Sequence, residues 1–154
     1  MCIRDRRYPR GSGIGVKPIP NEIEGFEIGK AKKIKDGQSV CILNFGVLMD
    51  QIDQIAEKKN YTLYDMRFIK PIDQEALEHA MQHETIITLE DNTLLGGCGS
   101  AVGEKLHKQK FKGNLLSIGL KDEFPAHGSR NEILRQNGLD EESIQKTIDN
   151  FLRN

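Results

Sequence analysis

From about residue 28 to the end of the chain, segments with the apolar pattern of strands alternate with segments that have the apolar pattern of helices. The apolar run of residues 39–46 ends at a glycine, which is typical of a strand buried on both faces. Further β-rich runs cover residues 61–69, 85–91 and 114–120. The segment IGKAKKIK, from residue 28, is expected to form a short edge strand, because its lysines discourage pairing with another chain.

Helices are predicted between and after these strands. The expected spans are 47–59, 74–82, about 101–108, about 129–136 and about 141–151. In the first of them, Val47, Ile52, Ile55 and Ala56 fall largely on one side. Asp73, Ser129 and Asp140 are placed to cap the second, fourth and fifth. This alternation predicts an α/β sandwich with a mostly parallel sheet, helices on both faces and right-handed crossovers.

The ligand-binding edge of such a sheet lies at the carboxyl ends of its strands. We therefore look for function in the loops after Phe45, Ile69, Leu89 and Leu120. The length of 154 residues, with 37% hydrophobic residues, suits one compact domain. Residues 1–20 are expected to be an upstream end and linker, with 1–6 foreign to it, and 21–154 the domain.

Charge and cysteine content exclude several classes of protein. With a formal net charge of -1, the chain has no excess positive charge that would attract nucleic acid or an anionic membrane. No apolar run is long enough to span a membrane. Cys2, Cys41 and Cys98 show no metal or disulfide spacing, so we expect a reducing, cytoplasmic setting. His79 and His83 share a predicted helix face but lack a third ligand, so no metal site is predicted.

Two loops carry candidate chemistry at the strand ends. LGGCGS, residues 95–100, contains Gly96, Gly97 and Gly99 before a helix, where amide groups attract anions. The alternative is a tight turn that packs the helix onto the sheet, with Cys98 as a small buried thiol. In EFPAHGSR, residues 123–130, His127 and Gly128 are interpreted as structural residues beside a helix start.

Two further segments carry mixed charge. DMRFIKPID contains Asp65, Arg67, Lys70, Pro71 and Asp73, and both an internal ion-pair network and a recognition surface fit it. In RYPRG, Arg7 and Arg10 flank an aromatic residue and a proline, and guanidinium groups suit phosphate oxygens. Solvated linker arginines are the alternative. No set of nucleophile, base and orienting partner is present.

Taken in order, RYPRG, ILNFG, DMRFIKPID, the acidic residue and asparagine before GGCGS, and the HG loop resemble the terminal domain of 1-deoxy-D-xylulose-5-phosphate synthases. The match runs from about Arg7 to the end of the chain. The resemblance implies a three-layer fold like the transketolase C-terminal domain, with about five strands and one antiparallel edge strand. It also implies an enzyme that joins pyruvate to glyceraldehyde 3-phosphate, with loss of carbon dioxide, for isoprenoid, thiamine and pyridoxal synthesis.

The resemblance further implies that thiamine diphosphate and magnesium bind to domains that this chain lacks, because no GDG motif is present. The expected partners are the missing N-terminal domains, a second copy in a homodimer, and small-molecule substrates. The fragment alone is expected to be inactive. The expected location is the bacterial cytoplasm, with a plastid as the alternative.

The resemblance places Arg7 at the substrate phosphate, with Arg10 second, and gives the other candidate residues packing roles between domains. Two rival interpretations stay open at this point. One is the β-subunit of a 2-oxo acid dehydrogenase, and the other is a freestanding α/β module that binds an anion at LGGCGS.

Overall fold

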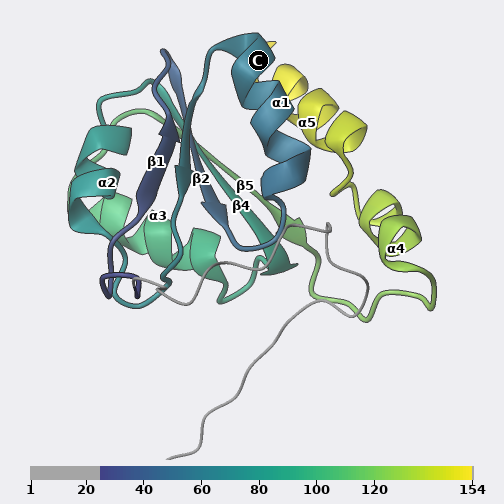
Figure 1. The fold of residues 1–154 in the computed structure, drawn as a ribbon. Helices are drawn as coiled ribbons and strands as arrows, with labels where there is room; N and C mark the ends of the chain where they lie inside the picture. The colour runs from purple at the N-terminus through teal and green to yellow at the C-terminus, as the bar shows by residue number, and fades with distance from the viewer. Residues whose placement is uncertain (1–24, 154) are drawn as a thin grey trace, which may run out of the picture.

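Figure 1 shows the computed structural model of the chain, which describes residues 25–153. Strands and helices alternate along these residues in the predicted order. The strands are β1 (Lys32–Lys35), β2 (Val40–Phe45), β3 (Thr62–Asp65), β4 (Thr85–Thr93) and β5 (Asn114–Leu120). The helices are α1 (Met49–Lys59), α2 (Gln74–Ala80), α3 (Cys98–Lys108), α4 (Arg130–Gln136) and α5 (Glu141–Arg153).

The five strands form one sheet in the order β1-β3-β2-β4-β5. β2, β3, β4 and β5 run parallel, whereas β1 pairs antiparallel with β3 at one edge. All residues of the central strand β2 are buried, because helices cover both faces of the sheet. The predicted α/β fold, a mostly parallel sheet with one antiparallel edge strand, is confirmed.

Two apolar cores lie on the two faces of this sheet. In Figure 1, α1, α4 and α5 cover one face, and α2 and α3 cover the other. Successive residues of β2 supply both cores, since Ile42 packs in the core under α1 and Leu43 in the core under α2. Both side chains are fully buried, and burial of a side chain of this size contributes roughly 1.5–3 kcal/mol. The three-layer sandwich follows from this alternation.

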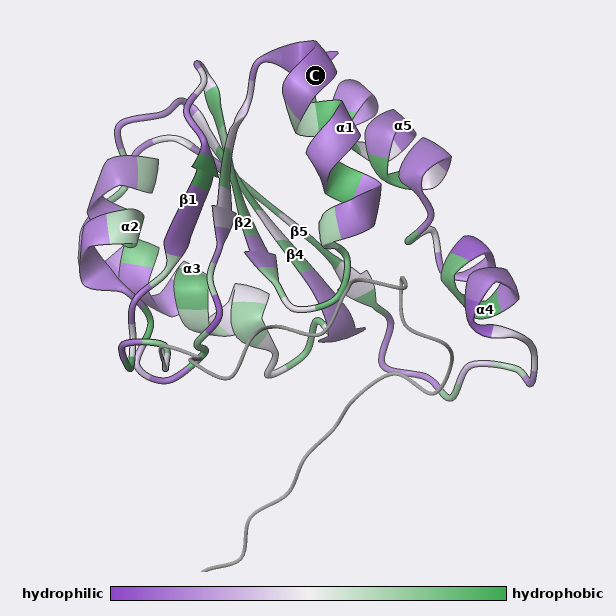
Figure 2. Ribbon diagram, viewed as in Figure 1, coloured by the Kyte–Doolittle hydropathy of each residue, from purple (hydrophilic) through white to green (hydrophobic). Residues whose placement is uncertain are grey.

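The antiparallel edge strand β1 is short and lysine-rich, as its sequence predicts. It is mostly purple in Figure 2, the colour of hydrophilic residues. The Nζ of Lys33 lies 3.1 Å from an Asp36 carboxylate oxygen, and Lys35 forms an ion pair with Glu57. Charged side chains of this kind block the pairing of a further strand along the edge.

Two predicted boundaries at the carboxyl ends of the strands are wrong. β3 ends at Asp65 and not near Ile69, because Arg67 adopts a φ of 54°, which a strand does not accommodate. α3 begins at Cys98, three residues before the predicted start, because the buried Glu90 carboxylate accepts a hydrogen bond from the Cys98 N–H.

The predicted apolar face of the first helix is also wrong at one position. Val47 lies before α1, with 41% of its surface exposed, whereas Ile52, Ile55 and Ala56 are buried as predicted. Two helix ends differ by two residues, since α2 ends at Ala80 and α5 continues to Arg153. β4 likewise continues two residues beyond its predicted end.

Candidate functional site

The carboxyl ends of the four parallel strands meet at one edge of the sheet, which we call the carboxyl edge. The antiparallel strand β1 begins at the same edge, where Lys32 lies opposite Asp65. The loops of this edge run along the lower part of Figure 1. They hold most of the candidate residues that the sequence indicates.

The central polar residue of the carboxyl edge is Glu90, near the end of β4. Its side chain is only 1% exposed. One carboxylate oxygen accepts a hydrogen bond from the backbone N–H of Cys98 at 2.8 Å, and the other accepts one from the N–H of Gly99 at 2.8 Å. The carboxylate therefore satisfies two of the amide groups that the start of α3 leaves unpaired, and its charge complements the helix dipole.

The glycines of this loop let the helix start approach the sheet closely. A Cβ on Gly97 would lie 2.3 Å from the Thr93 carbonyl oxygen and 2.4 Å from a Glu90 carboxylate oxygen. Gly96 has a φ of +71°, a backbone conformation that favours glycine. Gly97 is thus required by the close packing of the turn, and Gly96 is favoured by its backbone conformation.

Glu90 occupies the place that an external anion would take at the amino terminus of α3. The tight-turn interpretation of LGGCGS is therefore the one that the geometry supports. The Cys98 thiol is 3% exposed, and burial, reinforced by the Glu90 carboxylate, raises its pKa to about 12. A thiol with this pKa holds almost no thiolate at neutral pH, so Cys98 is a packing residue and not a nucleophile.

The segment after β3 combines a local ion pair with an aromatic contact. The Nε of Arg67 lies 3.5 Å from an Asp65 carboxylate oxygen, and the Arg67 guanidinium lies 4.2 Å from the centre of the Phe26 ring. Both contacts are partly exposed, so they hold the Arg67 side chain over Phe26, ahead of β1, without adding much stability.

Asp73 fixes the other end of this segment. It caps α2 as predicted, accepting hydrogen bonds from the N–H groups of Glu75 at 2.9 Å and Ala76 at 3.3 Å. Its second oxygen accepts one from the N–H of Ala31 at 2.8 Å, which ties the entry of β1 to α2. Lys70 is exposed, and the peptide bond that joins it to Pro71 is cis.

The loop after β5 places His127 and Gly128 on the surface. Both residues are exposed. Ser129 caps α4 as predicted, with a reciprocal pair of hydrogen bonds to Glu132. Arg130 lies 3.7 Å from an Asp91 carboxylate oxygen, which connects this loop to the end of β4.

Large apolar side chains project from the carboxyl edge into solvent. Six of the eight large exposed hydrophobic residues in the described part of the chain lie on its loops, with relative exposures of 41–102%. We call this set the carboxyl-edge surface, and its members are Phe26, Ile28, Val47, Ile69, Leu95 and Phe124. Exposed apolar side chains that gather in one region indicate an interaction surface.

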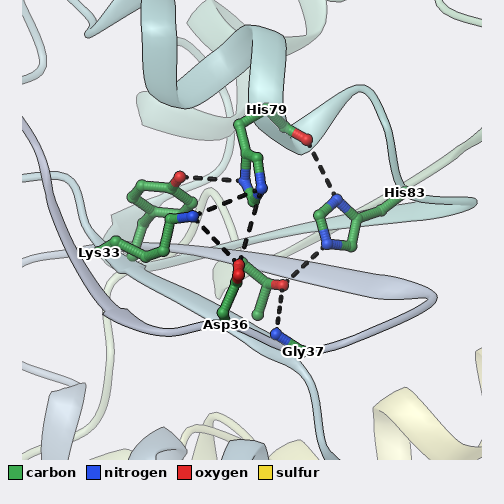
Figure 3. Close-up of polar contacts among 7 residues, drawn as sticks. Lys33, Asp36, Gly37, His79 and His83 are labelled. Atoms are coloured by element: carbon green, nitrogen blue, oxygen red, sulfur yellow. Dashed lines mark hydrogen bonds and ion pairs between the residues drawn. The ribbon is translucent and has the colours of Figure 1, made fainter.

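A second polar cluster lies at the opposite end of the sheet, around His79 and His83 (Figure 3). The Tyr64 hydroxyl lies 3.0 Å from His79 Nδ1, and Lys33 Nζ lies 3.5 Å from His79 Nε2. Burial lowers the pKa of His79, and the charge of Lys33 adds to the effect. The pKa of Asp36 is lowered mainly by its hydrogen bond from Lys33.

The hydrogen bonds of His83 assign its tautomer. The His79 carbonyl oxygen can only accept a hydrogen bond, so His83 Nδ1, 3.2 Å away, carries the hydrogen that it donates. In this tautomer His83 Nε2 accepts from the Thr62 hydroxyl at 2.8 Å, and Thr62 Oγ1 itself accepts from the N–H of Gly37 at 2.9 Å. Both ring nitrogens of His83 are thus engaged in joining the β1 turn to α2.

Residues 25–153 contain no group of three or more histidine, cysteine, aspartate or glutamate residues that could hold a metal ion. No helix in the described region is long and apolar enough to cross a membrane. Arg7 and Arg10, the candidate phosphate ligands, lie outside the described residues, so their role stays a prediction.

The fold and its carboxyl edge match a known class of domain. The family "Transketolase, C-terminal domain" matches residues 29–144, and the chain belongs to this family. A solved structure of a split-gene transketolase, described as an inactive β4 tetramer, has a TM-score of 0.73 and 25% identity. The alignment covers 81% of this chain and 43% of that one.

Within that class, the chain is similar to 1-deoxy-D-xylulose-5-phosphate synthases. It is 47% identical to the enzyme of Mannheimia succiniciproducens over 96% of this chain. It is 46% identical to that of Pasteurella multocida and 47% identical to that of Pseudoalteromonas atlantica, each over 95% of the chain. The chain spans 24% of the length of each of these relatives. The resemblance that the motifs indicate is confirmed.

Proposed function

We propose that the chain is the carboxy-terminal domain of a thiamine-diphosphate-dependent 1-deoxy-D-xylulose-5-phosphate synthase. The full enzyme condenses pyruvate with glyceraldehyde 3-phosphate and releases carbon dioxide. The domain holds the assembly together and supplies a substrate-phosphate ligand, while the cofactor binds elsewhere in the protein. Its similarity to the 1-deoxy-D-xylulose-5-phosphate synthases of Mannheimia succiniciproducens and Pasteurella multocida supports the assignment.

The observation that carries the packing role is the carboxyl-edge surface. Leu95 is 71% exposed and Ile69 55% exposed, although both follow strands whose residues are mostly buried. Covering such side chains stabilises an interface by about 25 cal/mol for each Å² of apolar area removed from water. The occupant that we propose is the remainder of the same longer protein, because the relatives are about four times the length of this chain.

The proposed role of Arg7, with Arg10 second, is to bind the phosphate group of glyceraldehyde 3-phosphate. A guanidinium fork holds a phosphate by charge-assisted hydrogen bonds, which turns binding energy into orientation of the aldehyde. In the full-length enzyme, Arg7→Ala should raise the KM for glyceraldehyde 3-phosphate strongly. An unchanged KM would remove Arg7 from the site.

The packing role has a test that separates it from folding. Leu95→Asn and Ile69→Asn should leave the unfolding of the isolated chain nearly unchanged, because these side chains are exposed there. In the full-length protein the same changes should lower the thermal stability of the assembly and its turnover. Leu152→Asn is the matched control, since Leu152 is 40% exposed in the last turn of α5, away from the carboxyl edge. Equal effects of all three changes would refute the surface.

The proposed location of the cofactor site can be checked by calorimetry. Thiamine diphosphate with magnesium, titrated into the isolated chain, should give no binding heat, and pyruvate with glyceraldehyde 3-phosphate should give no product. Micromolar binding of the cofactor, or any turnover, would place the active site within this chain and overturn the proposal.

A further inference from the structure

The two edges of the sheet differ in how they are protected against strand pairing. β1 carries three lysines in its four residues, Lys32, Lys33 and Lys35. β5, at the other edge, has the sequence NLLSIGL and carries no charge. Exposed edges without charge, proline or covering structure are those that pair with another strand. Within the described residues, β5 pairs with β4 alone.

The backbone groups that β5 turns away from β4 can be identified from its hydrogen bonds. The Asn114 N–H donates to Glu84 O at 2.9 Å, and the Leu94 N–H donates to Leu120 O at 3.0 Å, so Asn114 and Leu120 face β4. Since backbone direction alternates along a strand, the outward N–H and C=O groups belong to Leu115, Ser117 and Gly119.

We propose that β5 pairs antiparallel with β5 of a second copy of this chain, about a two-fold axis at Ser117. This pairing would join two sheets into one continuous sheet across a homodimer. It deepens the homodimer part of the proposed function and does not depend on the reaction assigned there. A closed two-fold dimer requires a self-complementary surface, and an antiparallel strand pair meets this condition.

The register follows from the outward backbone groups. With Ser117 opposite its own copy, Leu115 lies opposite Gly119 of the second chain, and Gly119 opposite Leu115. Each of these pairs is of the hydrogen-bonded type, so every outward N–H and C=O of Leu115, Ser117 and Gly119 finds a partner. A shift of the register by one residue on either chain would set outward groups against inward ones.

Side chains and charges agree with this register. On the face toward α4 and α5, Leu116 lies opposite Ile118 of the second chain, a cross-strand apolar pair that occurs twice by symmetry. Continued two residues beyond the strand ends, the same register would bring Lys112 near Asp122 of the second chain, and the symmetry would repeat this pair. Both are exposed, so opposite charges flank the pairing without a desolvated ion.

Sedimentation velocity of the 154-residue chain tests this inference. A concentration series from about 1 µM to about 1 mM covers the range expected of a modest interface, and a reversible monomer to dimer transition should appear. Ser117→Pro should raise the dimer Kd by at least about 100-fold, because it removes the central outward donor and places a ring in the interface. Ser117→Ala is the matched control, since it loses the same hydroxyl but keeps the amide group.

A charge exchange gives a second measurement on variants that change only exposed residues. Lys112→Glu and Asp122→Lys should each raise the dimer Kd by about fivefold, and the double variant should restore it. Lys146→Glu, at an exposed position of α5, should have no effect on Kd. If circular dichroism shows that Ser117→Pro does not fold, the charge-exchange series alone tests the β5 pairing.

Three outcomes would overturn the inference. They are a wild-type chain that stays monomeric throughout the series, a Ser117→Pro dimer as stable as that of Ser117→Ala, and a double charge exchange that does not restore association. The proposed function has a separate readout, because turnover of the full-length enzyme does not depend on which strand edge forms its dimer.

Discussion

Replacement of Glu90 should strongly lower the stability of the chain, although it removes little apolar packing. The carboxylate is 1% exposed and accepts hydrogen bonds from Cys98 and Gly99, both 2.8 Å long. Glu90→Ala removes both acceptors and leaves two N–H groups buried at the start of α3. Glu90→Gln keeps one acceptor and sets an amide NH₂ group against the other N–H.

The magnitude follows from the hydrogen bonds lost. A hydrogen bond to a charged group contributes about 1.5–3 kcal/mol, and loss of a buried partner falls at the upper end. We therefore expect Glu90→Ala to lower the free energy of unfolding by about 3–5 kcal/mol, and Glu90→Gln by about 1–3 kcal/mol. The first value is a large part of the total stability of a domain, which is about 5–15 kcal/mol.

Urea denaturation followed by circular dichroism measures these differences. Glu104→Gln is the matched control, because Glu104 is exposed on the same helix and should change stability by less than about 0.5 kcal/mol. Hydrogen exchange should also show faster exchange of the first amides of α3 in both Glu90 variants. A Glu90→Ala protein as stable as the control would refute the role assigned to this carboxylate.

Further predictions concern packing, pH and thiol reactivity. Gly99→Ala should destabilise the chain by about 1–3 kcal/mol in urea, because its Cβ would lie 2.7 and 2.8 Å from two side-chain hydroxyl oxygens of the sheet, whereas Gly103→Ala, with its closest contact at 3.4 Å, should not destabilise it. The folded-state pKa of His79 lies below the ordinary value of 6.5. As the pH falls, His79 therefore takes up its proton in the unfolded chain at a higher pH than in the folded chain. Stability should thus fall as the pH drops below about 6.5, and a His79→Gln variant that shows the same fall would contradict this. Cys41 and Cys98, each with a pKa raised to about 12, should resist iodoacetamide at pH 8 until urea unfolds the chain, as peptide mapping would show; alkylation of either in the native state would contradict their burial.

The sequence was sufficient to predict the elements of the fold, because the signals for them are local. The apolar run that became β2 and the lysines of β1 determine burial and edge position with no need of distant residues. Asp73 and Ser129 were likewise recognisable as helix caps. The end of β3 was not predictable, because the positive φ of Arg67 is set by the turn toward α2 and leaves no mark in a β-rich run.

The site was only partly predictable, because its key contact spans two elements. Glycine-rich spacing indicated a close approach at the start of α3, but it gave no sign that Glu90 fills that helix terminus. The available signal was an acidic residue near the end of an otherwise apolar strand, eight and nine residues before the amides it binds. The sequence indicated the loops of the carboxyl edge but not the exposed apolar side chains on them, since exposure depends on the packing of loops that are distant in sequence.

We propose that this chain can replace the terminal domain of a 1-deoxy-D-xylulose-5-phosphate synthase. The most direct test is a chimera in which it replaces the matching carboxy-terminal segment of the Mannheimia succiniciproducens enzyme, to which it is 47% identical. Turnover of pyruvate with glyceraldehyde 3-phosphate would be compared among the chimera, the parent enzyme and the isolated chain. We predict activity within about tenfold of the parent for the chimera, and none for the isolated chain. A folded chimera without turnover, or an isolated chain that forms product, would contradict the account.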